Sequence, residues 1–405
     1  MKRYLKNYVL TTNKVEEAIY DCLKNKWRRK DVSYFLAEYM MNDGDDIHDV
    51  ARYCRKIAYY KSTRYLLYET ISKAAESLCQ EIYDEDVTLK PIEYQFRFDA
   101  ASNKIREIGI ASIKQQVLDY VVVNACKKMF MAKIGFYQAA SIKNKGQVFG
   151  KNAIERWIRK DYGNSRYFYK CDIKKYYPNV SKAQLKRMLR RDIKEDYILY
   201  LVFTLIDTYK DGLCIGSYLS QFLANYYLSY AYHHVSENSY SIRKKKDGST
   251  IRINNSKHIL FYMDDIIIFS SSLKLLKRAV VDFKDYIYNT LELTIKPDDG
   301  IYKTSVTRID MMGYSISTVN TILRKRIFIK ITRAFMRALH KRNKLSLYFA
   351  RRILSYNGWI KHSDLYNFKK KFKITRTLNN AKKVVKYYDK RNFYRETKYL
   401  QLLPA

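Results

Sequence analysis

Glycine and proline are both scarce in this sequence, with 12 and 4 occurrences among 405 residues. This scarcity argues against a collagen-like chain, a loop-dominated chain and an all-β fold with many turns, because each of these needs more of both residues. No apolar run approaches the ~18 residues that cross a bilayer, and residues 1–21 contain no apolar core of a signal peptide. We therefore expect a cytoplasmic protein without membrane contact.

Cysteine is sparse as well, and the six cysteines lie far apart in the sequence. No pair has the short spacing of a zinc knuckle, and their density is too low for a disulfide scaffold. We expect reduced and mostly buried thiols.

Acidic residues are in the minority, with 40 Asp and Glu against 77 Lys and Arg and a formal net charge of +37. Such a surface attracts polyanions, either nucleic acid or a membrane face. The 40 tyrosines and 18 phenylalanines favour nucleic acid, because aromatic rings stack on bases. The alternative is that Lys and Tyr are common in all proteins of the source organism, so that the charge only forms a solvated surface without a binding role. Residues 321–405 hold 24 of the basic residues and only 3 acidic ones, which indicates a basic domain.

The hydrophobic content of 47% is sufficient for a large core, and its pattern changes along the chain. Residues 1–90 have the composition of helices, and the chain is again helical from about residue 322. Strand-like segments occur between these ends. They are a hairpin over 91–112 with its turn at 101–103, a strand over 166–177, two strand halves over 258–271 and a strand near 311–316. The pattern predicts an α+β fold.

Two adjacent carboxylates interrupt an apolar segment at residues 261–269. Asp264 and Asp265 cannot remain unpaired inside a buried strand, so they must reach solvent or a cation. Neighbouring residues on a strand point in opposite directions, so a tight hairpin turn at these two residues is the expected geometry. A simple Asp-Asp turn without further function is the alternative.

A third carboxylate, Asp172, interrupts the apolar strand of residues 167–173. Carboxylates on adjacent strands can hold two divalent ions about 3.5–4 Å apart, which is the arrangement for in-line phosphoryl transfer. Hard oxygen ligands without a nearby Cys or His favour Mg²⁺ over zinc.

These motifs, in this order, resemble the palm of reverse transcriptases. The strand with Asp172 corresponds to the first palm motif, and Tyr262-Met263-Asp264-Asp265 corresponds to the Tyr-x-Asp-Asp hairpin. The resemblance implies a right-hand polymerase with fingers, a palm with an antiparallel sheet and a helical thumb. It implies four regions: an N-terminal helical region over 1–90, fingers over 91–165, a palm over 166–321, and a basic helical thumb with the C-terminal tail over 322–405.

The resemblance implies two Mg²⁺ ions, for which Mn²⁺ can substitute, held by Asp172, Asp264, Asp265 and the backbone of Ile173. Lys104 and Arg106 lie where finger strands of such polymerases present cations to the triphosphate, and Arg suits this role because its planar fork binds phosphate oxygens. Tyr177 lies where reverse transcriptases place an aromatic gate against the 2′-hydroxyl. Lys296 resembles the lysine that follows the catalytic hairpin, and one ordinary lysine among many is its alternative.

Contacts to the template and primer are implied in four places, of which Tyr262-Met263 of the catalytic hairpin is one. In the other three, the loop 141–146 resembles a finger motif, Gly313-Tyr314 resembles the primer-grip hairpin, and residues 353–372 resemble a thumb segment. The implied contact residues are Lys143, Lys145, Tyr262, Met263, Gly313, Tyr314, Trp359 and Lys361. An ordinary basic surface loop is the alternative for residues 141–146.

The segment 214–221 indicates a subgroup. Most reverse transcriptases have Gln-Gly-x-x-x-Ser-Pro here, whereas this chain has Ile215-Gly216 followed by Ser220-Gln221. This form resembles the enzymes of bacterial or phage-encoded diversity-generating retroelements. The resemblance implies that Gly216, Ser220 and Gln221 line the nucleotide pocket and that Ile215 affects fidelity. It also implies an RNA template, an RNA–cDNA duplex, deoxynucleotides, errors at template adenines and a small accessory protein.

Two other interpretations stay open. A phage-defence reverse transcriptase would share related variants of these motifs. A non-catalytic RNA-binding protein on a polymerase scaffold is the second, although the three intact carboxylates argue against it.

Overall fold

The structure is a computed structural model that describes residues 4–99, 104–340 and 344–400, with side chains up to residue 391. The chain forms two compact units. The first unit comprises Met1–Ser141, Asp172–Asn238 and Val281–Pro297, and the second comprises Ile142–Cys171, Ser239–Val280 and Asp298–Ala405. Each unit is therefore assembled from segments that alternate along the chain.

The N-terminal part of the first unit is helical, as the composition predicts. Its helices are α1 (Thr12–Leu23), α2 (Lys30–Met40), α3 (Ile47–Tyr59), the 3-10 helix η1 (Lys61–Leu67) and α4 (Tyr68–Tyr83). In α1 the buried residues Val15, Ala18, Ile19 and Cys22 recur at intervals of three and four, so a single face packs into the core. That face lies against α4 and α5.

The rest of the first unit joins a hairpin to a group of buried helices. These elements are β1 (Glu93–Asp99), β2 (Lys104–Ile110), α5 (Ile113–Lys133), β3 (Gln138–Ala139), α7 (Tyr176–Asn179), α8 (Lys182–Asp192), α9 (Asp196–Asp207), α10 (Tyr218–His233) and the π-helices η3 (His234–Asn238) and η4 (Tyr286–Thr290). The antiparallel hairpin β1–β2 is present as predicted, and its predicted turn at 101–103 lies outside the described residues. Helices α5 and α10 pack against each other and are buried along most of their length.

Strands of the second unit form the sheet that carries the Asp-Asp turn. Four of them lie side by side in the order β7-β8-β4-β9, and both β7–β8 and β4–β9 are antiparallel. Their bounds are β4 (Tyr167–Asp172), β7 (His258–Tyr262), β8 (Asp265–Ser270) and β9 (Gly300–Lys303). Helix α6 (Gln147–Lys160) packs on β7, with the ring of Trp157 stacked on that of His258 at 4.8 Å between centroids.

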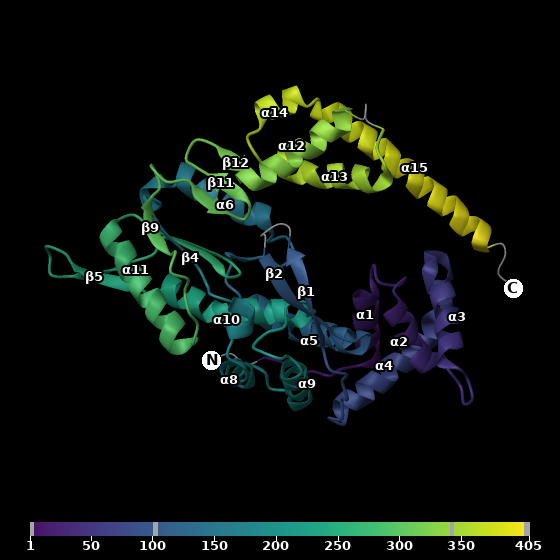
Figure 1. Ribbon diagram of the computed structural model, residues 1–405. Coiled ribbons are helices and arrows are strands. Elements are labelled where there is room, and N and C mark those ends of the chain that lie inside the picture. Colours follow the sequence, from purple (N-terminus) through teal and green to yellow (C-terminus); the bar gives the residue numbers. More distant parts are fainter. Residues whose placement is uncertain (1–3, 100–103, 341–343, 401–405) are drawn as a thin grey trace. The chain divides into compact units, whose positions relative to one another are not determined.

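The second unit also contains a small sheet, an exposed ribbon and the C-terminal helices. The elements are the 3-10 helix η2 (Tyr162–Asn164), β5 (Tyr240–Lys244), β6 (Thr250–Asn254), β10 (Ile309–Met311), β11 (Tyr314–Ile316), β12 (Thr321–Leu323), α12 (Lys325–His340), α13 (Leu347–Lys361), α14 (Tyr366–Lys371) and α15 (Ile374–Leu400). Helix α11 (Leu273–Asp285) begins in this unit, and its last residues belong to the first. The four C-terminal helices pack together, drawn in yellow-green and yellow in Figure 1.

Two predicted elements have different bounds. The strand expected over 166–177 ends at Asp172, because Lys175 has a positive φ of 45° and Tyr176–Asn179 form one helical turn. The hairpin turn expected at Asp264-Asp265 is centred on Met263 and Asp264, and Asp265 already belongs to β8. Within the described part of the chain, no helix is long and apolar enough to cross a membrane.

Candidate active site

The Asp-Asp hairpin of the second unit presents its carboxylates where two buried strands meet. Tyr262 pairs with Asp265 across the turn, and Met263 adopts a positive φ of 54°, which makes the turn tight. Asp264 and Asp265 are half-buried, whereas Ile266, Ile267 and Ile268 are completely buried. Burial raises the pKa of Tyr262, and the charge of Asp265 acts in the same direction. The hydrophobic strands thus hold the carboxylates at the edge of the core.

Lys170 of β4 supplies a cation to this hairpin. Its Nζ lies 3.4 Å from Oδ1 of Asp265, and the two side chains are 30% and 23% exposed. Lys170 precedes Asp172 by two residues on the same strand, so both side chains belong to one face of β4. Lys170 was not among the residues predicted from the sequence, because the alternation along residues 167–172 shows that it shares a face with Asp172 but not that β8 lies beside β4.

In the first unit, Asp172 forms an ion pair with Lys296. Ile173 forms a bridge with Ile295, and the carbonyl oxygen of Asp172 accepts a hydrogen bond of 2.9 Å from the Lys296 amide. This antiparallel pairing brings Lys296 Nζ into contact with Asp172 Oδ1. The lysine predicted to bind nucleotide is therefore in contact with the predicted metal ligand, and the side chains are 27% and 33% exposed.

The predicted sugar gate, Tyr177, is held through its backbone. Its carbonyl oxygen accepts a hydrogen bond of 2.8 Å from Leu213. A Cβ on Gly212 would lie 2.4 Å from the same oxygen, so only glycine permits this approach. The neighbouring Tyr176 is buried and donates a hydrogen bond of 2.6 Å to the carbonyl of Ala224. The ring of Tyr177 itself is half-buried.

The finger hairpin and the Ile215-Gly216 loop are in contact within the first unit. The Gly109 amide donates to the Ile215 carbonyl at 2.8 Å. Gly216 has a φ of +121°, and a Cβ there would lie 2.4 Å from the Gly109 carbonyl oxygen. Lys104 and Arg106, both exposed, share one face of β2, and Arg106 Nε lies 3.3 Å from Asp99.

A buried carboxylate that sequence analysis missed supports this loop. Asp119 of α5 accepts hydrogen bonds from the Ser217 hydroxyl at 2.7 Å and from the amides of Tyr218 and Leu219 at 3.0 and 3.4 Å. It thereby caps the start of α10, which contains Ser220 and Gln221. Ser220 is completely buried and Gln221 is half-buried. In the sequence, Asp119 could have been recognised as the one acidic residue within the otherwise apolar helical segment 117–123.

The predicted finger loop of the second unit is a turn that leads into α6. Lys143 is exposed, whereas Lys145 is half-buried, and burial lowers the pKa of Lys145. The Lys145 Nζ lies 5.9 Å from the centre of the Phe149 ring.

Two predicted primer and thumb segments meet in the second unit. Gly313 has a φ of +84°, and a Cβ there would lie 2.7 Å from the Trp359 ring. The rings of Tyr314 and Trp359 are 5.2 Å apart between centroids. Lys361 is exposed at the end of the same helix, α13. The structure therefore brings together residues that the sequence separates by about 45 positions.

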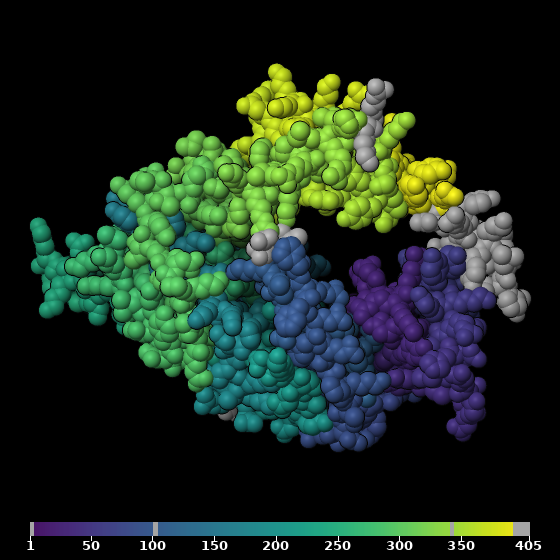
Figure 2. All heavy atoms as spheres, in the orientation of Figure 1, coloured from purple at the N-terminus to yellow at the C-terminus, as the bar shows by residue number. Residues whose placement is uncertain are grey.

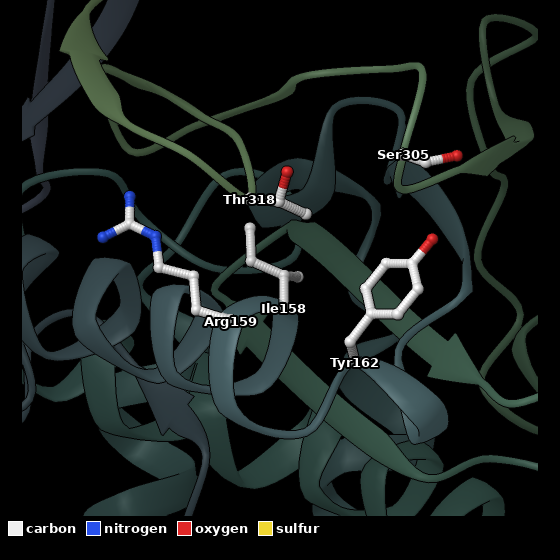
Figure 3. Close-up of a pocket in the computed structure, with 5 residues that line it drawn as sticks. All are labelled: Ile158, Arg159, Tyr162, Ser305 and Thr318. Atoms are coloured by element: carbon white, nitrogen blue, oxygen red, sulfur yellow. The ribbon is translucent and has the colours of Figure 1, made fainter.

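The predicted site residues lie in both units, and the described part of the chain contains no cluster of three or more His, Cys, Asp or Glu arranged to hold a metal. A separate pocket of about 400 Å³ in the second unit is lined by none of them (Figure 3). Its lining residues are Ile158, Arg159, Tyr162, Ser305 and Thr318. Arg159 is engaged structurally, because it donates to Thr321 at 3.0 Å.

Solved structures of two telomerases are similar to this chain at low identity. One is apo telomerase from Candida tropicalis, truncated from its C-terminal domain, with a TM-score of 0.41, 11% identity and coverage of 70% of this chain and 74% of that chain. The other is telomerase from Candida albicans in complex with the TWJ fragment of telomeric RNA, with a TM-score of 0.42, 11% identity and coverage of 82% and 68%. No curated protein matches.

The sequence profile described as "Reverse transcriptase (RNA-dependent DNA polymerase)" matches residues 97–316. This segment is slightly more than half of the chain and includes Asp172, Asp264 and Asp265. The chain therefore belongs to the reverse transcriptase family, and it is an RNA-directed DNA polymerase, a nucleotidyltransferase, with the predicted right-hand polymerase fold.

Proposed function

We propose that this enzyme copies a template RNA into error-prone cDNA as part of a diversity-generating retroelement, with Asp172, Asp264 and Asp265 as its catalytic metal ligands. The observation that carries the polymerase part is the family match over residues 97–316, which contains the three carboxylates in the order of the palm motifs. The retroelement part is supported by the Ile215-Gly216 and Ser220-Gln221 signature.

Reverse transcriptase domains use divalent metal ions, and the residues present fit Mg²⁺. Asp172 and Asp265 are partly buried, and each carries a lysine ammonium at its Oδ1, so each position already accommodates a cation. All candidate ligands are oxygens: three carboxylates and the backbone of Ile173. When bound, the ions would activate the primer 3′-hydroxyl and stabilise charge on the leaving pyrophosphate.

The remaining residues of the proposal bind and orient substrate. Lys104 and Arg106 are exposed on one face of β2, where phosphate oxygens can reach them. Tyr177 is half-buried, and its carbonyl oxygen accepts a hydrogen bond from Leu213; its ring would exclude the 2′-hydroxyl of a ribonucleotide. Lys296, which forms an ion pair with Asp172, would neutralise the charge of that carboxylate before a nucleotide binds.

Primer extension with Asp172→Asn and Asp264→Asn tests the catalytic assignment. We expect synthesis to fall by at least ~10³-fold, because each change removes charge from a metal ligand while keeping the side-chain volume. Asp247→Asn, at the exposed tip between β5 and β6, is the matched control and should retain wild-type rates. Near wild-type synthesis by either active-site variant, with normal folding by circular dichroism, would show that the assignment is wrong.

Ile215 carries the proposed mutagenic function. Its backbone is held by Gly109, so the side chain can change without altering the loop. A glutamine here could hydrogen-bond to the base pair, whereas isoleucine offers only apolar surface, and one hydrogen bond is worth about 1 kcal/mol. We expect Ile215→Gln to lower the error rate at template adenines several-fold, with little change at the other bases. Deep sequencing of cDNA from a defined RNA measures this.

The same sequencing separates the alternatives. Uniformly low error in the wild-type enzyme would favour a phage-defence polymerase over a diversity-generating one. Complete absence of synthesis, together with tight RNA binding, would favour a non-catalytic RNA-binding protein. The expected partner is a small accessory protein of the retroelement that binds the enzyme and RNA, and co-purification of the enzyme with the products of neighbouring genes tests it.

A further inference from the structure

A two-stranded ribbon of the second unit, β5–β6, is positively charged along its whole length. Residues 239–257 contain six Lys and Arg and one acidic residue, Asp247. Four of the cations are consecutive, Arg243 to Lys246, at the end of β5 and in the turn. None of these four is in an ion pair with any residue that the structure describes. Their charge is therefore presented to solvent.

The ribbon is exposed on both faces. It extends away from the other strands of its unit in Figure 1 and forms a thin projection in Figure 2. Arg243 pairs with Ile251 and Lys244 with Thr250, so cations occur on both faces. Ile242 is 68% exposed on one face and Ile251 is 40% exposed on the other. Burial of apolar side chains in a core therefore does not explain why the ribbon is ordered.

A buried polar root nevertheless fixes the ribbon in place. An isolated two-stranded hairpin is marginally stable at best in water, so a rigid one needs an anchor. Asn255, only 2% exposed, donates through its amide to the Ser239 carbonyl at 3.0 Å and through Nδ2 to the Ser239 hydroxyl at 3.1 Å. Its Oδ1 accepts from Ser241 at 2.6 Å, and its carbonyl accepts from Ser270 of β8 at 2.7 Å.

This root extends to α11 and to the base of the ribbon. Arg278 donates to the Ser241 hydroxyl at 2.7 Å. At the outer side of the base, the guanidinium of Arg252 lies 3.7 Å from the centre of the Tyr240 ring. The ribbon is thus a fixed support for cations rather than a loosely tethered loop.

We propose that the β5–β6 ribbon binds the phosphate backbone of a polynucleotide. A rigid ribbon with cations at its tip and on both faces can place several of them against successive phosphates, and a ribbon of two strands is narrow enough to enter a groove. Its net charge of +5 is complementary to such a backbone. Lysines that only protect exposed strand edges from aggregation are the competing explanation. The inference rests on the proposed polymerase function and deepens it, since it names a nucleic-acid contact on strands that carry none of the three proposed catalytic carboxylates.

The test compares two variants with the same net charge. The ribbon variant changes Arg243, Lys244, Lys245 and Lys246 to Gln. The control changes four exposed lysines of the first unit to Gln: Lys24, Lys73, Lys127 and Lys128. Fluorescence anisotropy with single-stranded RNA, a 20-base-pair RNA duplex and an RNA–DNA hybrid, from 50 to 200 mM KCl, gives the affinity and its salt dependence without any synthesis.

For the ribbon variant we expect the slope of log affinity against log salt to decrease by about 3, because each lost phosphate contact removes roughly 0.7–0.9. The control should change by less than about 1. A loss confined to one of the three polymers supports the proposal and identifies the form that is bound. Equal slopes for the two variants would overturn it.

Primer extension keeps this result separate from the polymerase assignment. With saturating short primer–template, the ribbon variant should extend at wild-type rates, since its changes touch no predicted catalytic residue. Loss of synthesis with unchanged binding would also overturn the proposal. If the wild-type enzyme makes no DNA, the polymerase proposal fails, while the binding comparison still decides the role of the ribbon.

Discussion

Asp119 provides a sharp test of how the Ile215-Gly216 loop is supported. Its carboxylate is completely buried, and one oxygen, Oδ2, accepts all three hydrogen bonds from the start of α10. Oδ1 is buried without a hydrogen-bond partner among the described residues. Burial therefore raises the pKa of Asp119 from 3.8 to about 6, although the bonds from Ser217, Leu219 and Tyr218 act in the opposite direction.

This shift makes stability depend on pH. The folded state keeps the proton of Asp119 up to about pH 6, whereas the unfolded chain loses it near pH 3.8. The stabilisation is thus fully present below pH 3.8 and is lost as the pH rises through 6. A shift of about two units corresponds to about 3 kcal/mol, of which about 2 kcal/mol lies between pH 4.5 and 7.5.

We expect Asp119→Asn to remove this dependence. Urea unfolding at several pH values should show that the stability of the wild type relative to the variant falls by about 2 kcal/mol from pH 4.5 to 7.5. Asp119→Ala, which leaves buried donors without an acceptor, should cost about 1–3 kcal/mol at every pH.

Asp192→Asn is the control, because that carboxylate is also buried in the first unit but is shifted in the opposite direction. Burial alone would raise its pKa, yet bonds from Lys133, Tyr230 and Tyr226 lower it overall. The stabilisation by Asp192 is lost only below pH 3.8. Asp192→Asn should therefore lower the free energy of unfolding by an amount that does not change between pH 4.5 and 7.5. Parallel curves for the wild type and Asp119→Asn would refute the reasoning.

Three further changes test other parts of the enzyme. Tyr177→Ala should admit ribonucleotides into the product, since the ring is lost while Leu213 still holds the backbone; unchanged discrimination in competition assays would assign the gate elsewhere. Gly216→Ala should destabilise the first unit by about 1–3 kcal/mol in urea unfolding, since its φ of +121° and the Gly109 carbonyl exclude a Cβ; unaltered stability would contradict this. Replacing the exposed lysines 369, 370, 371 and 373 by Gln should reduce the salt dependence of primer–template binding by about 2–3; an unaffected slope would make the thumb charge a solubilising shell.

The sequence was sufficient for features that are local. An acidic residue within an apolar strand is conspicuous, so Asp172, Asp264 and Asp265 could be selected, and the α+β pattern followed from periodicity. The turn at Met263-Asp264 was displaced by one residue because a strand pattern does not show which residue takes the positive φ. The strand after residue 166 was predicted too long because Tyr176 and Tyr177 continue the aromatic pattern inside a helical turn.

Residues that depend on tertiary pairing could not be found in this way. Lys170 resembles many other lysines until β4 is placed beside β8, and Asp119 has no visible partner until α5 and α10 pack. Lys296 was selected for nucleotide binding, but its ion pair with Asp172 arises from the pairing of Ile173 with Ile295, which no periodicity predicts.

The same charge arrangement recurs in both units, and it explains how carboxylates persist at the edge of a core. In the first unit Lys296 neutralises Asp172, and in the second Lys170 neutralises Asp265. Both pairs are about one-quarter to one-third exposed, where an ion pair contributes only ~0–1 kcal/mol, so stability is an insufficient reason for them. Each pair instead places a lysine ammonium on a flexible four-carbon stem beside a partly exposed carboxylate, so the lysine side chain can move away when a divalent cation arrives. Each unit therefore carries acidic groups whose charge is balanced within that unit, in a chain whose excess of 37 positive charges is otherwise available to nucleic acid.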